Sequence, residues 1–297
     1  MGVIRGTLEL SEMKKGKISI AIPSNVLENN KDLRAKTQKI GQIARACVIY
    51  NVEQIIIYSI NKNFLKKFSK DIDLISKILE YLDCPQYLRR LLFPKLPIFN
   101  FVGLLPPLRT PPHPIEKKIS QILSGSIREG AVLFSNKRFS EIDIGLEIPI
   151  KVEIPNLPLK SRITLKLKKQ GANLSGKVIK KTDIREYWGY NIKIFNDSIL
   201  QFMEKFKNHI IIATSRQGNP LRKNDLENFQ FTANNKILLL FGSPNIGLFE
   251  IYESNGLKLK EMVEFVLNIA PQQGTKTIRV EEAILSTLSI VSNLISL

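Results

Sequence analysis

The sequence contains few of the side chains that most often bind zinc or form disulfides. Among 297 residues there are two cysteines, Cys47 and Cys84, and two histidines, His113 and His209. No pair of them has the spacing of zinc ligands, and a disulfide framework is unusual in a chain of this size. We therefore expect buried, reduced thiols, no metal site and no catalytic triad based on histidine.

Long apolar runs and the common nucleotide-binding motifs are missing as well. No run reaches the roughly 18 apolar residues that suggest a membrane span, and the N-terminus lacks the apolar core of a signal peptide. These absences favour a cytoplasmic protein without membrane contact. Neither GxGxxG nor GxxxxGK(S/T) occurs, so a Rossmann dinucleotide site and a phosphate-binding loop are both unsupported.

Negative charge is scarce. The chain has 27 Asp and Glu residues against 44 Lys and Arg residues, which gives a net charge of +17. A charge of this size attracts polyanions, so nucleic acid is the partner that we expect. The hydrophobic content of 43% is ordinary for a chain that buries a core, and disorder of the whole chain is not expected.

The first part of the chain has an α/β pattern. Residues 18–23 and 52–59 are short apolar runs, which are typical of parallel strands buried on both faces. Residues 32–50 have helical spacing. Residues 71–92 predict one or two helices, with Pro85 marking a new helical start.

The last part of the chain repeats this pattern. Residues 209–215, 236–243 and 264–271 predict three more buried strands, and residues 277–295 predict a long helix. The sequence therefore predicts five parallel strands, two before and three after an intervening segment.

The intervening segment has a different composition. Residues 93–114 are rich in proline, which excludes a regular helix or a central strand there. From residue 128 to about residue 183 the apolar segments are short and alternate with polar residues, as in the run RITLKLKK. We expect an ordered crossover followed by a small antiparallel barrel or sandwich.

The chain is thus expected to have three parts. Residues 1–92 form the first half of an α/β domain, and residues 187–297 form its second half. Residues 93–186 contain the proline-rich crossover and the inserted β-module.

Small residues follow each of the three C-terminal strands, in the loops at residues 214–218, 241–244 and 268–275. In open α/β sheets, ligands bind beyond the carboxyl ends of the strands, and small residues let backbone amides approach a ligand. Ordinary turns also need glycine and serine, so composition alone leaves both interpretations open.

A longer pattern points to a ligand site. The stretch NIAPQQGTKTIRVEEAI at residues 268–284 resembles the last conserved motif of the SPOUT superfamily. It is more closely similar to the branch of RNA methyltransferases that carry an inserted barrel. The same branch is matched by GQIARA from Gly41, LEYLDCPQYLR from Leu79, GLL from Gly103, REG from Arg128, YWGY from Tyr187 and LFG from Leu240.

The resemblance implies an α/β fold with a trefoil-knotted parallel sheet, helices on both faces and an inserted, small OB-like antiparallel barrel. It also implies a homodimer, and a pocket in which the knotted loops hold S-adenosylmethionine mainly through backbone groups. The cofactor-binding residues expected from it are Thr214, Ser215, Arg216, Gly218, Phe241, Gly242, Ser243, Asn268, Ile269, Ala270, Pro271, Gln273, Gly274, Thr277, Ile278 and Arg279.

Arg45 is the residue to which the resemblance gives a catalytic role. By itself an arginine on the helix predicted over residues 32–50 could simply be solvated. In SPOUT enzymes the matching arginine reaches the RNA or the reacting base, and a guanidinium suits a phosphate or a base carbonyl. Glu281 and Glu282 stand at the start of the last predicted helix, where negative side chains interact favourably with the helix dipole. A structural role therefore fits them at least as well as a role as general base.

The inserted module supplies the expected RNA-binding surface. Residues 151–185 hold ten Lys and Arg residues but two Asp and Glu residues, a one-sided charge that fits contacts to a phosphate backbone. Aromatic residues for base stacking are limited to Phe134 and Phe139. The RNA-binding residues that we expect are Lys166, Lys168, Lys169, Lys177, Lys180 and Lys181.

The sequence therefore predicts an S-adenosylmethionine-dependent RNA methyltransferase that acts on ribosomal RNA, with N3 of a uridine as an acceptor assigned in the family. The alternative is a non-catalytic RNA-binding or ribosome-assembly factor that retains the knot. This alternative is favoured by Gln272, which replaces a glycine of the family's Pro-Gly-Gln-Gly motif. A DNA-binding protein is a third hypothesis, supported only by charge.

Overall fold

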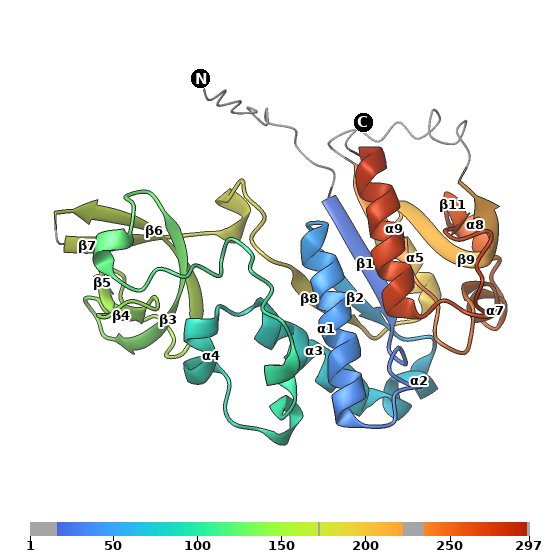
Figure 1. Cartoon of the computed structure of the whole chain (residues 1–297), viewed down its shortest axis with the longest axis horizontal. Helices are drawn as coiled ribbons and strands as arrows, with labels where there is room; N and C mark the ends of the chain where they lie inside the picture. The colour runs from blue at the N-terminus through green and yellow to red at the C-terminus, as the bar shows by residue number, and fades with distance from the viewer. Residues whose placement is uncertain (1–16, 172, 222–234, 296–297) are drawn as a thin grey trace, which may run out of the picture.

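The computed structural model describes residues 17–171, 173–221 and 235–295 (Figure 1). In this part of the chain, six parallel strands form one sheet in the order β11-β9-β10-β1-β2-β8. In that order their bounds are Phe265–Asn268, Ile210–Pro220, Lys236–Leu240, Lys17–Pro23, Gln54–Tyr58 and Asn191–Phe195. The parallel α/β sheet predicted from the apolar runs is confirmed.

Strand β8 is the one strand of this sheet that the sequence does not predict. It lies at the edge of the sheet beside β2, and it exposes Asn191, Lys193 and Ile194. Strand β8 has no continuous apolar run, because only part of its surface is buried.

Helices cover both faces of the sheet, as the resemblance implies. One face packs against α1 (Leu33–Ile49), α3 (Ser69–Asp83) and α9 (Val280–Ile295). The other face packs against α5 (Ile199–Lys205), α7 (Leu248–Glu253) and α8 (Leu259–Met262). The side chain of Asp32 begins α1 by accepting a hydrogen bond from the amide of Ala35 at 2.8 Å.

The region predicted as one or two helices contains two. Helix α3 ends at Asp83, and α4 (Gln86–Leu92) begins directly after Pro85, as expected. A further short helix, α2 (Lys62–Lys67), precedes them and is not predicted. The proline-rich crossover contains short 3-10 helices at Pro97–Phe99 and Val102–Leu104, and another follows at Ile119–Gln121.

The segment at residues 214–218 is not the loop that the sequence predicts. Strand β9 continues to Pro220, and after a register shift its last residues pair with the end of β11. Gly218 permits this pairing, because a Cβ there would lie 2.6 Å from the carbonyl oxygen of Val266. The glycine thus has a packing role between two strands.

The inserted module is a nearly closed antiparallel barrel, which fits the expected OB-like fold. Its strands, in the order β5-β4-β3-β6-β7, are Ile150–Val152, Ser140–Asp143, Ile127–Ser135, Arg162–Gln170 and Asn173–Ile179. Strands β5 and β7 approach each other, since a Cβ at Gly176 would lie 3.0 Å from Ile150. The short strand β4 is not distinguished in the sequence pattern.

A buried ion-pair network joins the barrel to the α/β domain; we call it the junction network, and it consists of Asp83, Glu129, Arg162, Lys181 and Trp188. Arg162 donates to Glu129 Oε2 at 2.7 Å and to Asp83 Oδ2 at 2.9 Å. Trp188 donates its indole N–H to Glu129 Oε1 at 2.5 Å. Burial lowers the pKa of Arg162, but Asp83 and Glu129 outweigh that effect and raise it.

Gly189 is required beside this network. Its φ of +82° lies in the left-handed region, and a Cβ there would be 2.0 Å from Asp83 Oδ1. The chain therefore returns from the barrel to the sheet through a position that only glycine fits.

Candidate functional site

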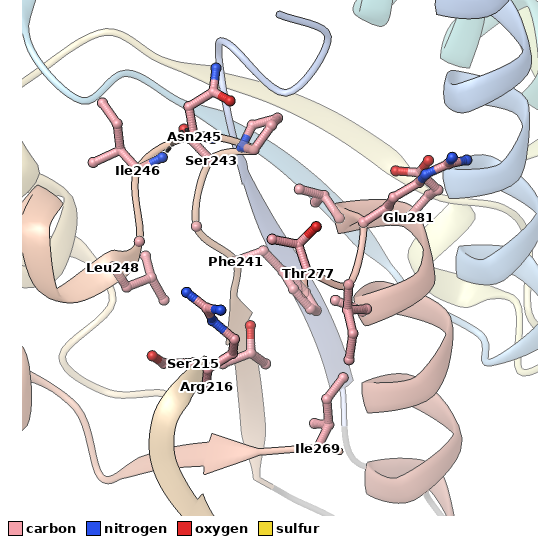
Figure 2. Close-up of a pocket in the computed structure, with 18 of the residues that line it drawn as sticks. Ser215, Arg216, Phe241, Ser243, Asn245, Ile246, Leu248, Ile269, Thr277 and Glu281 are labelled. Atoms are coloured by element: carbon pink, nitrogen blue, oxygen red, sulfur yellow. Dashed lines mark hydrogen bonds between the residues drawn. The ribbon is translucent and has the colours of Figure 1, made fainter. Parts of the chain in front are cut away.

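A cavity of about 620 Å³ lies beyond the carboxyl ends of β1, β9, β10 and β11 (Figure 2). This is the position where open α/β sheets bind ligands. Its wall comes from segments far apart in the sequence: the loop after β1, the end of β9, the turn after β10, the segment after β11 and the start of α9. The volume lies within the range of roughly 300–1,000 Å³ typical of small-molecule sites.

Most of the predicted cofactor residues line this cavity: Thr214, Ser215, Arg216, Phe241, Gly242, Ser243, Asn268, Ile269, Gln273, Thr277, Ile278 and Arg279. Gly218, Ala270, Pro271 and Gly274 are not part of its wall. Gly218 packs between strands instead. The three segments chosen from the sequence thus converge on one site, although residues 214–218 belong to β9.

The turn after β10 is shaped by Ser243. Its hydroxyl accepts hydrogen bonds from the amides of Asn245 and Ile246 at 3.3 and 3.1 Å. Asn25, fully buried in the loop after β1, donates to the same hydroxyl at 3.2 Å. The hydroxyl of Ser243 is therefore used to hold the turn, and the backbone of the turn faces the cavity.

The segment between β11 and α9 is fixed by its own polar groups and by β9. Asn268 donates to the carbonyl of Arg216 at 3.0 Å and accepts from the amide of Ala270 at 3.1 Å. Arg216 donates to the carbonyl of Lys276 at 2.9 Å. The middle of the motif recognised in the sequence is therefore held in a fixed conformation, although it is neither helix nor strand. It forms part of the cavity wall.

One feature of the wall was not predicted from the sequence. Lys39 of α1 and Glu281 of α9 form an ion pair, with Nζ 3.0 Å from Oε2. Their side chains are only 7% and 10% exposed, and both line the cavity. The one available signal was a lysine on the buried side of a helical pattern, at a position next to Ile40.

The cavity wall combines apolar side chains with backbone groups. Phe241 is 1% exposed and, with Leu248 and Ile269, gives part of the wall an apolar character. Gly242 lets the turn pack closely against the start of α7, since a Cβ there would lie 3.2 Å from the amide nitrogen of Leu248. Apolar side chains beside backbone groups are a common composition of small-molecule sites.

The comparison with known families decides the class of the protein. Residues 17–291 match the model of the family described as "Putative RNA methyltransferase". The chain belongs to this family. The RNA methyltransferase predicted from the sequence is confirmed at this level, and the family implies a methyl donor as co-substrate.

Named relatives cover most of the chain. The 28S rRNA (uridine-N(3))-methyltransferase of Homo sapiens is 30% identical over 304 residues, which span 92% of this chain and 77% of the human protein. The protein of the same name from Mus musculus is 29% identical over 300 residues, spanning 92% and 75%. That from Drosophila melanogaster is 28% identical over 307 residues, spanning 92% and 61%.

In this RNA methyltransferase, Arg45 does not line the cavity. It lies on the exposed side of α1 and donates a hydrogen bond to the carbonyl of Leu108 at 2.7 Å. The contact connects α1 to the proline-rich crossover. Its predicted catalytic role stays a prediction.

The predicted RNA-binding lysines fall into two groups. Lys166, Lys168, Lys177 and Lys180 are exposed, and Lys166 and Lys177 face each other across β6 and β7. Lys169 donates to the carbonyls of Ser120 and Ile122, and Lys181 lies 3.9 Å from Asp83 and from Glu129. The first four form an outward-facing surface, which we call the lysine face.

The remaining predictions concern thiols, metals and membranes. Cys47 and Cys84 are buried free thiols, and burial raises the pKa of Cys84 to about 11. Among the described residues, no cluster of His, Cys, Asp and Glu has the composition and spacing of a metal site. No helix in the described ranges is long and apolar enough to cross a membrane.

Proposed function

We propose that the protein transfers a methyl group from S-adenosylmethionine to N3 of a uridine in ribosomal RNA. The single observation that carries the proposal is the cavity beyond β9, β10 and β11, which gathers the motif residues of an RNA methyltransferase. The acceptor is suggested by the names of the human, mouse and fly relatives. The sulfonium of this cofactor supplies an electrophilic methyl group.

The protein's own task is to bind and to align. The turn held by Ser243 and the segment after Asn268 offer backbone groups to the cofactor, with Phe241 behind them. Fixing two reactants in line can supply roughly 7–11 kcal/mol of a barrier. We assign the cofactor to this cavity and retain Arg45 as a contact to the RNA or the reacting base.

The lysine face is the proposed contact to the RNA backbone. It presents four exposed ammonium groups on the outside of the barrel, Lys166, Lys168, Lys177 and Lys180. Such contacts are independent of sequence and sensitive to salt. The junction network fixes this surface relative to the cavity.

The trefoil knot and the homodimer complete the proposal, because both follow from the family resemblance. In the dimer, the cofactor cavity would lie near the subunit interface. Sedimentation equilibrium checks the dimer, and a monomer at micromolar concentration would contradict it.

The decisive experiment is transfer of radiolabelled methyl from S-adenosylmethionine to ribosomal RNA, followed by nucleoside chromatography. The expected product is N3-methyluridine. Label in another nucleoside would correct the acceptor. RNA binding with no label at all would favour the non-catalytic assembly factor, for which Gln272 is the specific observation.

A further inference from the structure

The stability of the fold does not by itself explain the Lys39–Glu281 ion pair. A buried ion pair is often no more stabilising than apolar residues of the same size. Helices α1 and α9 already share one apolar core, to which Ile40, Ile284 and Leu288 contribute, each fully buried. A cation and a carboxylate in the wall of a reaction cavity therefore call for a chemical explanation.

Glu281 differs from the neighbouring carboxylates. Its Oε2 is buried and accepts no hydrogen bond from the residues that the structure describes, although Lys39 Nζ lies at ion-pair distance. Glu250, the other carboxylate of the wall, is exposed and accepts from the amide of Gly247 at 3.3 Å. Glu282 is exposed, lies outside the wall and accepts from the amide of Arg279 at 2.9 Å.

The position of Glu281 suits contact with an acceptor base. Figure 2 shows it at the start of α9, across the cavity from the turn at Ser243 and Asn245, with Thr277 between them. The turn and the segment after β11 are the proposed cofactor contacts. A base that enters beside the bound cofactor would meet the start of α9.

We propose that Glu281 accepts the N3 proton of the target uracil, and that Lys39 is a positioning residue that holds the carboxylate in place. The inference rests on the proposed function, because uracil N3 carries a proton that must leave. The Glu281 carboxylate takes this proton as the N3–H bond breaks, and the electron pair on nitrogen forms the new bond to the methyl carbon. The bond from methyl to sulfur breaks and its electron pair stays on sulfur, so the carboxylate and the sulfonium both become neutral.

Among the described residues, the charged groups around Glu281 include more cations than further carboxylates. The nearest cation is Lys39 on α1. In the described ranges, the other charged groups of the cavity wall and of the start of α9 are Arg216 on β9, Glu250 on α7, and Arg279 and Glu282.

The test uses the full-length protein and compares Glu281→Gln with the matched control Glu282→Gln. Single-turnover transfer to a ribosomal RNA fragment should fall by about 10²–10⁴-fold for Glu281→Gln and stay near the wild-type rate for Glu282→Gln. Affinity for S-adenosylhomocysteine, measured by calorimetry, and the melting temperature should be retained in both. The defect of Glu281→Gln should shrink as the pH rises, and also on RNA with 5-fluorouridine at the target, because its N3 proton leaves more readily.

Lys39→Met is the second variant. It leaves the carboxylate without its counter-charge, so the rising limb of the pH–rate profile should move to higher pH. A Glu281→Gln defect that is equal at every pH and on both acceptors would overturn the proton-acceptor role. If Glu281→Gln instead lost affinity for S-adenosylhomocysteine, Glu281 would be a contact to the cofactor. Absence of transfer by the wild-type protein would overturn the proposed function and this role together, whereas the ratio between variants tests this role alone.

Discussion

Replacing Arg162 with methionine should destabilise the protein by about 3 kcal/mol. The side chain is 22% exposed and forms the shortest ion pairs to two carboxylates that are 8% and 0% exposed, Asp83 and Glu129. Removing one partner of a buried ion pair costs roughly 3–5 kcal/mol, because the remaining charge is left without compensation. Lys181, 3.9 Å from both carboxylates, offsets part of the loss, so we take the lower end of the range.

The assay is thermal and urea unfolding followed by fluorescence. A loss of about 3 kcal/mol corresponds to a fall in melting temperature of roughly 6–12 °C for a chain of this size. Trp188 is the single tryptophan of the chain, is 7% exposed and donates to Glu129, so its emission reports directly on the junction network. We expect a red shift in the folded Arg162→Met variant, as water reaches the indole.

Lys181→Met is the matched control, since it removes a cation from the same network. That side chain is 39% exposed and more distant, so its removal should cost about 0–1 kcal/mol. If Arg162→Met cost no more than Lys181→Met and left the emission unchanged, the junction network would not fix the barrel, and the reasoning would be refuted.

Three further predictions concern the site. Ser243→Ala should weaken S-adenosylmethionine binding in calorimetry by about fivefold, or about 1 kcal/mol in total, since the two amides of the turn lose their shared acceptor; unchanged affinity would place the cofactor elsewhere. Arg45→Ala should keep fold and cofactor affinity but reduce methyl transfer about 10²–10³-fold, more than it reduces RNA affinity; a loss of RNA affinity alone would make it a phosphate contact. Replacing the lysine face with glutamine should flatten the dependence of log K on log salt by roughly 0.7–0.9 per lost phosphate contact, and an unchanged slope would mean that RNA binds another surface.

The sheet was predictable where burial on both faces leaves an apolar run. Strands β1, β2 and β10 carry such runs and were found from them. Strand β8 was missed, because an exposed edge strand has no pattern of its own. The extension of β9 to Pro220 was missed because pairing with β11 depends on a partner more than forty residues away, beyond what local spacing contains.

The site was predictable as a set of loops but not as a chemical arrangement. The rule on carboxyl ends of strands, together with the family motif, brought Thr214, Phe241 and Asn268 into one cavity. The pair of Lys39 and Glu281 was not found, since a lysine in a helical pattern is normally solvated. Only the packing of α1 against α9 places these two side chains within 3.0 Å of each other.

The facing pair of Lys166 and Lys177 gives salt two opposite effects on this protein. Like charges directly opposite each other on neighbouring strands repel and destabilise the sheet. Added salt screens this repulsion, so the unliganded barrel should become more resistant to unfolding as the ionic strength rises. The same salt weakens the hold of the barrel on a polyanion. RNA that binds only the folded barrel raises the apparent stability of the barrel by mass action. The barrel should therefore be least stable when both salt and RNA are removed.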